Sequence, residues 1–364
     1  MKDLFNGSYN GKKVLVTGHS GFKGSWLVYW LFLMGADVVG FSLEPPTKPN
    51  HISLLKDLNI VSIIGDIRNK HQLEDVFKKY QFDIIFHLAA QPLVRQSYRD
   101  PIETYETNLM GTLYLFEMAR KFNIKALVNI TTDKVYENKE QIWGYREDDP
   151  LEGYDPYSSS KSCSEILTQS YRNSFFNPQE YKKTHNTLLA TCRAGNVIGG
   201  GDWAKERIMS DIIYAIQNNM PLTIRYPKAV RPWQHVLEPL SGYLMLGTKL
   251  LEEDVFFAQA WNFGPKEQMH YCVEDLVCSV KKHWNQFEYE ILEEKVPHET
   301  SLLLLDCTKA LYYLQWEAVW DFQTTVEKTI LWYKNFYLQN ATATLDDINS
   351  YVLEAKRKGL LWAA

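Results

Sequence analysis

The length, composition and charge of the chain exclude several classes of protein. It has 364 residues, of which 45% are hydrophobic and 14% aromatic, so it can bury one large core or two modest ones. The net charge is −5 and no long basic run is present, which argues against nucleic acid as a partner. The polar N-terminus and the lack of an apolar stretch of ~20 residues predict a cytoplasmic protein without membrane spans. Five cysteines at irregular spacings predict neither a disulfide framework nor a metal site.

The first half of the chain alternates strand and helix patterns. We expect strands at 13–17, 37–41, 60–64, 83–88, 125–131 and 187–193, and helices at 24–35, 71–80, 101–122 and 157–176. Such alternation predicts an α/β fold with a doubly wound parallel sheet. Later helices are expected at 236–252, 273–287 and 323–338. The sheet domain should therefore span 1–198, joined by some later segments, and 199–364 should form mainly a smaller, mostly helical lobe.

A glycine-rich turn follows the first strand pattern. Gly18, Gly21 and Gly24 stand between the aliphatic run at 13–17 and an apolar helical pattern. Glycines in this context let the backbone approach a pyrophosphate, which binds at the N-terminus of the helix. The spacing differs from the G-x-G-x-x-G fingerprint. The order of strand, turn and helix nevertheless favours a Rossmann-type dinucleotide site over a turn that only packs a helix on a sheet.

Small or polar residues follow most of the predicted strands. They are Gly18, Asp66, Ala89 and Ala90, Thr132 and Asp133, and Asn196. Ligands of parallel sheets bind beyond the carboxyl ends of the strands. We therefore expect these residues to converge on one site.

Tyr157 and Lys161 stand four residues apart at the start of the helix predicted at 157–176. Positions i and i+4 lie on one helix face, so the ammonium should lie near the phenol. A nearby positive charge lowers the pKa of tyrosine from its usual value of about 10. The pair predicts a base that takes a hydroxyl proton while hydride passes to a nicotinamide cofactor.

Longer runs resemble the extended short-chain dehydrogenase/reductase superfamily and, within it, the CDP-glucose 4,6-dehydratase family, over nearly the whole chain. The runs are 18–26, 87–95, 133–134, 144–146, 153–157, 172–177, 193–203 and 231–236. The resemblance implies an NAD-dependent lyase that converts CDP-glucose to CDP-4-keto-6-deoxyglucose with loss of water. The pathway implied is deoxysugar synthesis for lipopolysaccharide O-antigen. A homodimer or a dimer of dimers is also implied, built on the helices at 101–122 and 157–176. Phe116, Met118 and Leu167 could contribute to that interface, and core packing would explain the same residues.

The resemblance also implies a cofactor site in 1–198. NAD is favoured over NADP, because no arginine follows the second strand to meet a 2′-phosphate. Asp66 is similar to the carboxylate that accepts from the adenine amine. The implied NAD-binding residues are Gly18, His19, Gly21, Phe22, Lys23, Gly24, Asp66, Ile67, Leu88, Ala89, Ala90, Tyr157 and Lys161.

The implied catalytic residues are Thr132, Asp133, Lys134, Tyr157 and Lys161. Tyr157 would take the proton of the sugar 4-hydroxyl, and Asp133 would protonate the departing 6-hydroxyl. Family members that act on dTDP-glucose carry Asp-Glu where this chain has Asp133 and Lys134. The base that removes the C5 proton therefore stays open. It is Lys134, or else Lys134 only pairs with Asp133 while water or Tyr157 takes the proton.

The lobe at 199–364 should hold the nucleotide sugar. Guanidinium groups suit diphosphate oxygens, and Arg193 is a further candidate for that role. The implied substrate-binding residues are Gln91, Arg95, Asn196, Arg207, Arg225, Arg231 and His235. Two rival functions are a 4-epimerase or dehydratase acting on a GDP-, dTDP- or UDP-linked hexose or heptose, and a non-catalytic NAD sensor. Epimerases need no second acid/base pair, and sensors commonly lose the tyrosine or lysine, so the sequence argues against these two. A dehydratase for another nucleotide or for a heptose stays open, because cytidine is implied by the resemblance alone.

Overall fold

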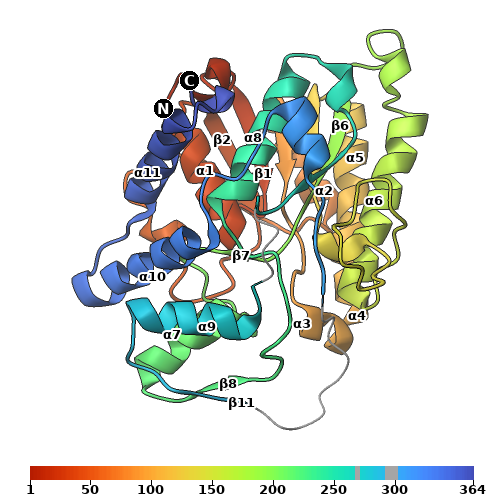
Figure 1. The fold of residues 1–364 in the computed structure, drawn as a ribbon. Helices are drawn as coiled ribbons and strands as arrows, with labels where there is room; N and C mark the ends of the chain where they lie inside the picture. The colour runs from red at the N-terminus through yellow and green to blue at the C-terminus, as the bar shows by residue number, and fades with distance from the viewer. Residues whose placement is uncertain (267–270, 292–301) are drawn as a thin grey trace.

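A seven-stranded parallel sheet lies at the centre of the computed structural model, which describes residues 1–266, 271–291 and 302–364 (Figure 1). Its order is β10-β6-β5-β4-β1-β2-β3. The six strands expected in the first half are confirmed to within a residue at each end, whereas β10 was not predicted. The strands are β1 Lys13–Thr17, β2 Asp37–Ser42, β3 Val61–Ile64, β4 Ile84–His87, β5 Ala126–Ile130, β6 Leu188–Ala194 and β10 Ala260–Phe263.

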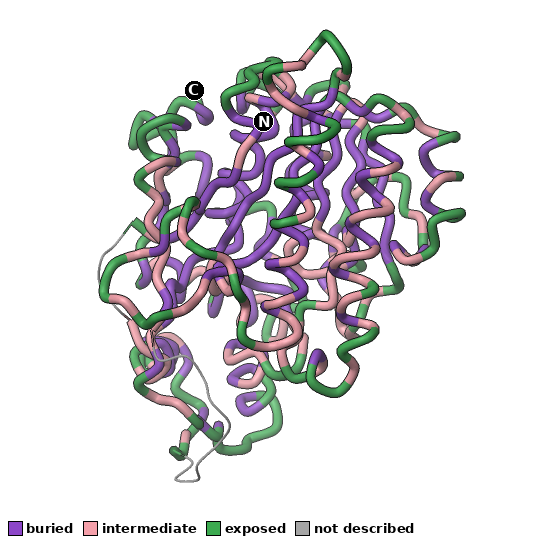
Figure 2. The backbone as a smooth tube through the Cα atoms, turned by 90° about the vertical axis from the view of Figure 1, so that its right-hand side faces the viewer, coloured by how far each residue is buried: buried purple, intermediate pink, exposed green. Residues whose placement is uncertain are grey.

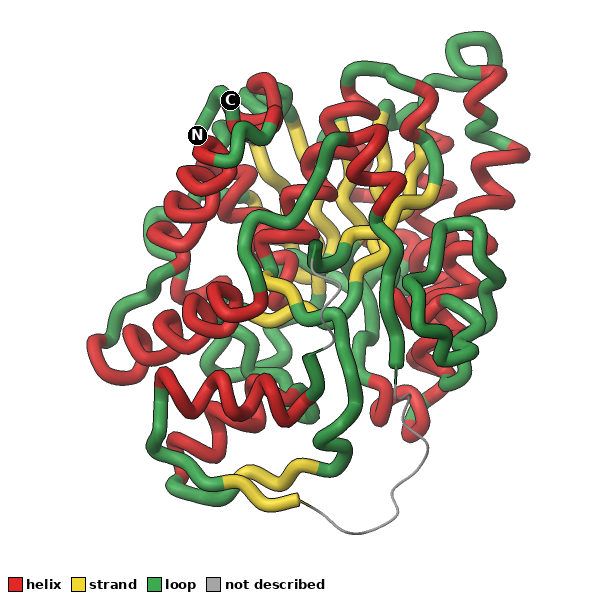
Figure 3. The backbone as a smooth tube through the Cα atoms, viewed as in Figure 1, coloured by secondary structure: helices red, strands yellow, loops and turns green. Residues whose placement is uncertain are grey.

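Helices cover both faces of this sheet (Figure 3). The helix expected at 101–122 is α4 and α5 joined by a π-helical turn, η3 Glu106–Met110. Of the helices, α3, α7 and α11 were not predicted. The helices are α1 Phe22–Leu33, α2 Lys70–Lys79, α3 Val94–Arg99, α4 Pro101–Tyr105, α5 Gly111–Lys121, α6 Pro156–Ser174, α7 Ile208–Asn218, α8 Leu237–Leu251, α9 Val273–His283, α10 Phe322–Gln339 and α11 Thr344–Arg357.

Most strands of the sheet are buried, as the purple backbone in Figure 2 shows, whereas the edge strand β3 is largely exposed. Side chains alternate along β1: Val14 lies in the core that includes α1 and α8, and Leu15 lies in the core that includes α2 and α5. This arrangement explains why the strands are almost continuously apolar in sequence. Phe116 and Met118 are buried in the second core. Of the two roles that the sequence left open for these residues, interface and core packing, the structure shows core packing for Phe116 and Met118.

The second half of the chain is divided between the sheet and a smaller lobe. Strand β10 joins the sheet beside β6, and α8 packs over the sheet. The small lobe contains α7, α9 and a two-stranded parallel sheet of β8 Leu222–Ile224 and β11 Tyr289–Ile291 (Figure 1). A further short parallel pair, β7 Val197–Ile198 and β9 Gln234–His235, follows the end of β6. None of the described helices has the length and apolar character that crossing a bilayer requires.

The two ends of the chain lie side by side (Figure 1). The ring of Phe5 stacks on that of Trp362 with centroids 5.0 Å apart. Both side chains are buried, so the N-terminal and C-terminal turns complete one part of the core together.

Candidate active site

The glycine turn after β1 has no room for a side chain at Gly18 or Gly24. Gly18 has φ +74°, and a Cβ there would lie 2.7 Å from the nitrogen of Ala89. A Cβ on Gly24 would lie 2.1 Å from the Gly18 oxygen. Gly21 begins α1 without a side-chain cap, so the N–H groups of the first helical turn are offered to a ligand. The turn therefore fits a dinucleotide pyrophosphate.

The residues implied for the adenine end lie beyond β3. Both carboxylate oxygens of Asp66 accept from the Arg68 guanidinium, the shorter contact being 2.7 Å. Although burial alone would raise the pKa of Asp66, the hydrogen bonds and charge of Arg68 hold it below its usual value. Ile67 is buried against Gly111. Asp66 is thus an ionised acceptor whose oxygens already have one partner within the chain.

His19 lies behind the glycine turn. Its ring hydrogen-bonds Ser62 at 2.7 Å and Ser42 at 3.0 Å, and it fills the space left by Gly40. Burial lowers the pKa of His19 to about 4, so the ring is neutral at pH 7. The side chain joins the turn to β2 and β3, and only the backbone of His19 is left to meet a cofactor.

Tyr157 and Lys161 lie one turn apart at the start of α6. Lys161 Nζ donates to the carbonyl of Ile130, at the end of β5, at 3.0 Å. Burial raises the pKa of Tyr157 to about 12, while Thr132 and Arg207 act in the opposite direction. The expectation that Lys161 lowers this pKa stays a prediction, because burial dominates the pKa of Tyr157 here and the ammonium is directed at a backbone carbonyl. Burial, with Lys23 beside it, lowers the pKa of Lys161 itself to about 8.

Thr132, Asp133 and Lys134 follow β5 directly. Thr132 Oγ1 donates to Asp133 Oδ1 at 3.0 Å, and Lys134 Nζ lies 3.8 Å from the same oxygen. Asp133 Oδ2 is buried and has no hydrogen-bond partner in the described part of the chain. An unpaired buried carboxylate oxygen is costly in a folded protein and is typical of a functional site. The ion pair is compatible with both roles considered for Lys134.

Two cationic side chains from other elements, Lys23 and Arg207, interact electrostatically with Asp133 and Tyr157. Lys23, in the first turn of α1, is half-buried; burial and the charge of Arg207 lower its pKa to about 8, whereas Asp133 opposes that change. Arg207 precedes α7, and its Nη1 donates to Asp202 Oδ2 at 2.6 Å. Its charge favours the phenolate form of Tyr157. Arg207, predicted to bind substrate, therefore also acts on the catalytic tyrosine.

A polar cluster joins the loop after β4 to α6. Gln91 donates to Thr104 Oγ1 at 2.9 Å, and its backbone exchanges hydrogen bonds with the Asn108 side chain. Asn108 also donates to Ser160 Oγ at 2.9 Å. Asn108 lies in the π-helical turn and was not predicted from the sequence. The sequence carried no signal for it, because the π-helical turn and the burial of Asn108 are seen only in the structure.

The predicted substrate residues beyond β6 have different environments. Asn196 Oδ1 is buried and has no partner among residues that the structure describes, so it can accept from a ligand. Arg231 is also buried, and its Nη1 donates to the carbonyl of Val230 at 2.8 Å. Arg225 is exposed, and Arg95 lies 4.0 Å from Glu206. These groups stay candidates for the nucleotide diphosphate.

His235 is fully buried, with its ring centroid 4.8 Å from that of Trp320 and 5.7 Å from that of Trp26. Burial lowers its pKa to about 3. Direct contact of this side chain with substrate is therefore not supported, because aromatic rings enclose it.

Arg193 is not a diphosphate ligand. Its guanidinium forms a buried, two-contact ion pair with Glu165, with both distances at 3.0 Å. The expectation that its guanidinium binds the diphosphate is wrong, because the charge is satisfied within the core. Glu165 was missed, although it stands four residues after Lys161 on the same helix.

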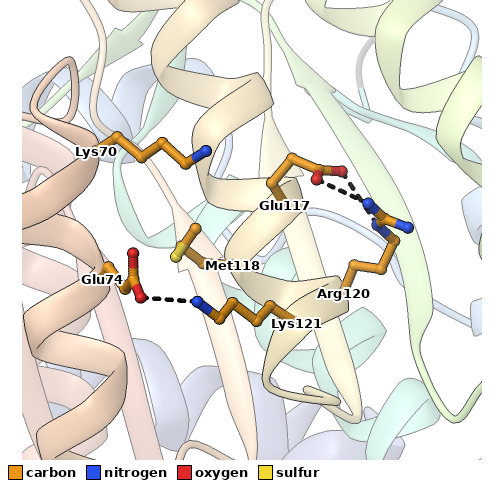
Figure 4. Close-up of a pocket in the computed structure, with 6 residues that line it drawn as sticks. All are labelled: Lys70, Glu74, Glu117, Met118, Arg120 and Lys121. Carbon is orange, nitrogen blue, oxygen red and sulfur yellow. Dashed lines mark hydrogen bonds and ion pairs between the residues drawn. The ribbon is translucent and has the colours of Figure 1, made fainter.

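A surface pocket of about 350 Å³ lies between α2 and α5, away from the residues described above (Figure 4). Glu74 accepts from Lys121 at 2.7 Å, and Glu117 accepts from Arg120 at 2.9 Å. Because the charges pair with each other on the surface, this pocket is not a candidate active site. Its lining residues are Lys70, Glu74, Glu117, Met118, Arg120 and Lys121.

Fold and site together define an extended short-chain dehydrogenase/reductase. The family model described as GDP-mannose 4,6 dehydratase matches residues 15–329, and the chain belongs to this family. A CDP-glucose 4,6-dehydratase of Salmonella typhimurium is 49% identical over 90% of this chain and 91% of that protein.

Solved structures agree on the fold. A dTDP-glucose 4,6-dehydratase from Bacillus anthracis, in complex with NAD, superposes with a TM-score of 0.73 at 21% identity, over 90% of this chain and 98% of that one. A UDP-glucuronic acid 4-epimerase from Bacillus cereus, in complex with UDP-glucuronic acid and NAD, gives 0.75 at 24% identity, over 89% and 100%.

Proposed function

We propose that the chain is an NAD-dependent CDP-glucose 4,6-dehydratase that forms CDP-4-keto-6-deoxyglucose. The observation that carries the proposal is the Asp133–Lys134 pair beside Tyr157, with the buried Asp133 Oδ2 open to a ligand. A 4-epimerase needs only one acid/base group, whereas elimination of water needs an acid and a base in addition. The similarity to the Salmonella typhimurium enzyme supports cytidine as the nucleotide.

The residues divide the chemistry between them. NAD, held at the turn of Gly18 and Gly24, would supply reversible hydride transfer between C4 and C6 of the sugar. Tyr157 takes the 4-hydroxyl proton, and Arg207 and Thr132 offset part of the burial that disfavours its phenolate. Asp133 gives a proton to the departing 6-hydroxyl. Lys134 is placed to take the C5 proton, unless it serves only as the partner of Asp133.

The first half of the chain binds NAD, and the second half supplies most contacts to the nucleotide sugar. The turn at Gly18 and Gly24 holds the pyrophosphate of NAD, and Asp66 accepts from its adenine. The second half supplies the nucleotide-sugar contacts, from Arg207, Arg225 and Arg231. Asn196 adds an acceptor for the sugar diphosphate region.

The cellular setting follows the same proposal. The enzyme would act in the cytoplasm as a homodimer or a dimer of dimers. It would supply deoxysugars for lipopolysaccharide O-antigen. The interface between copies would use the exposed side of α5 and α6, where Ile166 and Phe175 are exposed.

The direct test is incubation of the purified protein with CDP-, dTDP-, GDP- and UDP-hexoses, each followed by mass spectrometry. We expect loss of one water from CDP-glucose alone, without net accumulation of NADH. A changed sugar configuration at constant mass would instead identify an epimerase. No change with any donor would contradict the proposed enzyme.

A further inference from the structure

The loop that carries Asp133 and Lys134 is attached to helix α6. We call residues 130–136 the catalytic segment. Lys161 Nζ donates to the carbonyl of Ile130 at 3.0 Å, and Ser162 Oγ donates to the carbonyl of Val135 at 2.9 Å. The segment is therefore held near both of its ends by the helix that also carries Tyr157.

Glu165, one turn further along α6, adds a third attachment. Its buried carboxylate accepts from the hydroxyl of Thr131, from Thr191 Oγ1 at 2.9 Å, and twice from Arg193 at 3.0 Å. Although burial alone would raise the pKa of Glu165, Arg193 holds it below its usual value. The carboxylate stays ionised and fixes Thr131, the residue before Thr132.

Arg193 extends this attachment to the far end of the segment. Its Nη1 donates to the hydroxyl of Tyr136 at 2.8 Å and to the carbonyl of Glu147 at 2.9 Å. The guanidinium also lies over the Tyr136 ring, 5.0 Å from its centroid. One ion pair thus contacts both Thr131 and Tyr136, which flank Thr132, Asp133 and Lys134.

We propose that Glu165 and Arg193 are positioning residues that fix Asp133 and Lys134 relative to Tyr157. The proposal rests on the proposed dehydratase function. Both side chains are buried and fully bonded within the chain, so they touch neither substrate nor cofactor. Tyr157 lies on α6 itself and keeps its place without the pair. Asp133 and Lys134 lie on the attached loop, so the pair serves loss of water more than oxidation at C4.

The alternative is a purely stabilising ion pair. Buried pairs are weak evidence for stability, and removal of one partner is destabilising wherever the pair lies. A stabilising role predicts that all steps of the reaction decline together. A positioning role predicts that the steps separate, because only the elimination of water uses the attached loop.

The test is a single turnover of CDP-glucose by the NAD-loaded enzyme with Glu165→Gln. NADH absorbance follows oxidation at C4, and mass spectrometry follows loss of water. We expect oxidation near the wild-type rate, elimination slowed about 10- to 100-fold, and accumulation of NADH as a spectroscopic signature. Amide hydrogen exchange in residues 130–136 should increase at the same time. Equal slowing of both steps, or unchanged elimination, would overturn the proposal.

Two further variants keep the test decisive. Thr131→Val removes only one contact of Glu165, so it should fold if Glu165→Gln does not, and should slow elimination in the same selective way by a smaller factor. Glu238→Gln neutralises another buried carboxylate, in α8, and should leave both steps unchanged. A selective loss in Glu238→Gln, or none in Thr131→Val, would overturn the proposal.

The experiments distinguish failure of the proposed dehydratase function from failure of the proposed positioning role of Glu165 and Arg193. Wild-type protein that leaves CDP-glucose unchanged would overturn the proposed function together with the positioning role. An active wild type whose Glu165→Gln variant slows both steps equally would overturn the positioning role alone.

Discussion

The catalytic segment and the substrate-binding residues beyond β6 contrast in how firmly hydrogen bonds within the chain hold them, although Asp133 Oδ2 in the segment is itself left without a partner in the described residues. Around residues 130–136, Lys161, Ser162 and Glu165 bond to the segment from one helix. Beyond β6, Asn196 Oδ1 lacks a partner within the described chain, and Arg225 is exposed. The machinery for proton transfer is therefore built before substrate arrives, whereas recognition of the nucleotide is completed by the ligand itself. Preorganised groups lose little freedom during the reaction.

The largest expected effect on the preorganised half of this comparison comes from removing the proposed base, Tyr157. Tyr157→Phe removes the hydroxyl while it keeps the ring, so the fold and the cofactor site should persist. We expect turnover of CDP-glucose to fall by about 10²- to 10⁴-fold, the usual contribution of a general base. Steady-state kinetics measure the loss, and titration of NAD fluorescence quenching checks that cofactor binding is retained. Full turnover with bound NAD would disprove the assignment.

Lys134→Met separates the two roles considered for that lysine. If Lys134 is the C5 base, loss of water should fall by about 10²-fold or more, while oxidation at C4 continues. Quenched-flow mass spectrometry and NADH absorbance follow the two steps. Lys134→Arg provides a charge-retaining control. Elimination at the wild-type rate in Lys134→Met would leave Lys134 as a partner of Asp133 only.

Binding of the nucleotide diphosphate beyond β6 can be tested by comparing two arginines, Arg231 and Arg225. Arg231 is buried beside the lobe and Arg225 is exposed. A guanidinium bound to phosphate within a partly buried site is worth more than one in water. We expect Arg231→Ala to raise KM for CDP-glucose about 10-fold with little change in kcat, and Arg225→Ala to raise it less. The reverse order would move the diphosphate site toward β8.

The smallest expected effect is on the pH dependence of stability, and it follows from a comparison of two buried carboxylates, Glu165 and Glu238. Glu165 is bonded to a cation, whereas Glu238 accepts from the backbone of Val319 and Trp320 and from the Tyr351 hydroxyl. Burial raises the pKa of Glu238 from 4.5 to about 7. Because the folded pKa lies above the unfolded one, its contribution to stability is present below about pH 4.5 and lost as pH rises through 7.

The free energy of unfolding should therefore fall between pH 5 and 8, by on the order of 3 kcal/mol from Glu238. Urea denaturation at several pH values measures it, and Glu238→Gln should flatten the profile. Parallel profiles for the variant and the wild type would show that Glu238 is not the responsible group.

Much of the sheet was predictable because its strands carry local signals. Aliphatic runs such as 13–17 and 83–88 are bounded by turns, and the helices between them have clear periodicity. Strand β10 was missed, because Ala260–Phe263 is short and contains an asparagine. That asparagine accepts from Tyr136, a partner 126 residues away, so the reason for its presence is tertiary.

In the candidate site, the sequence predicted which residues lie at the carboxyl ends of the strands, but not which side chains form ion pairs or hydrogen bonds with one another. Gly18, Ala89 and Asp133 meet at one edge because parallel strands end there, as their sequence positions implied. Arg193 lies near the end of β6, but its charge is paired with Glu165, and the sequence does not reveal this pairing. Lys161 was expected to act on Tyr157 by helical spacing alone. The direction of a long side chain depends on which carbonyl the neighbouring strand offers.

The stacking of Phe5 on Trp362 has a consequence for synthesis of the chain. A nascent polypeptide leaves the ribosome from its N-terminus, so Phe5 emerges long before the tryptophan that covers it. Until then the first turn exposes an aromatic ring that the finished protein buries, and its docking is among the last events of folding. The part of the core around Phe5 should therefore close only after Trp362 has been synthesised and has left the ribosome.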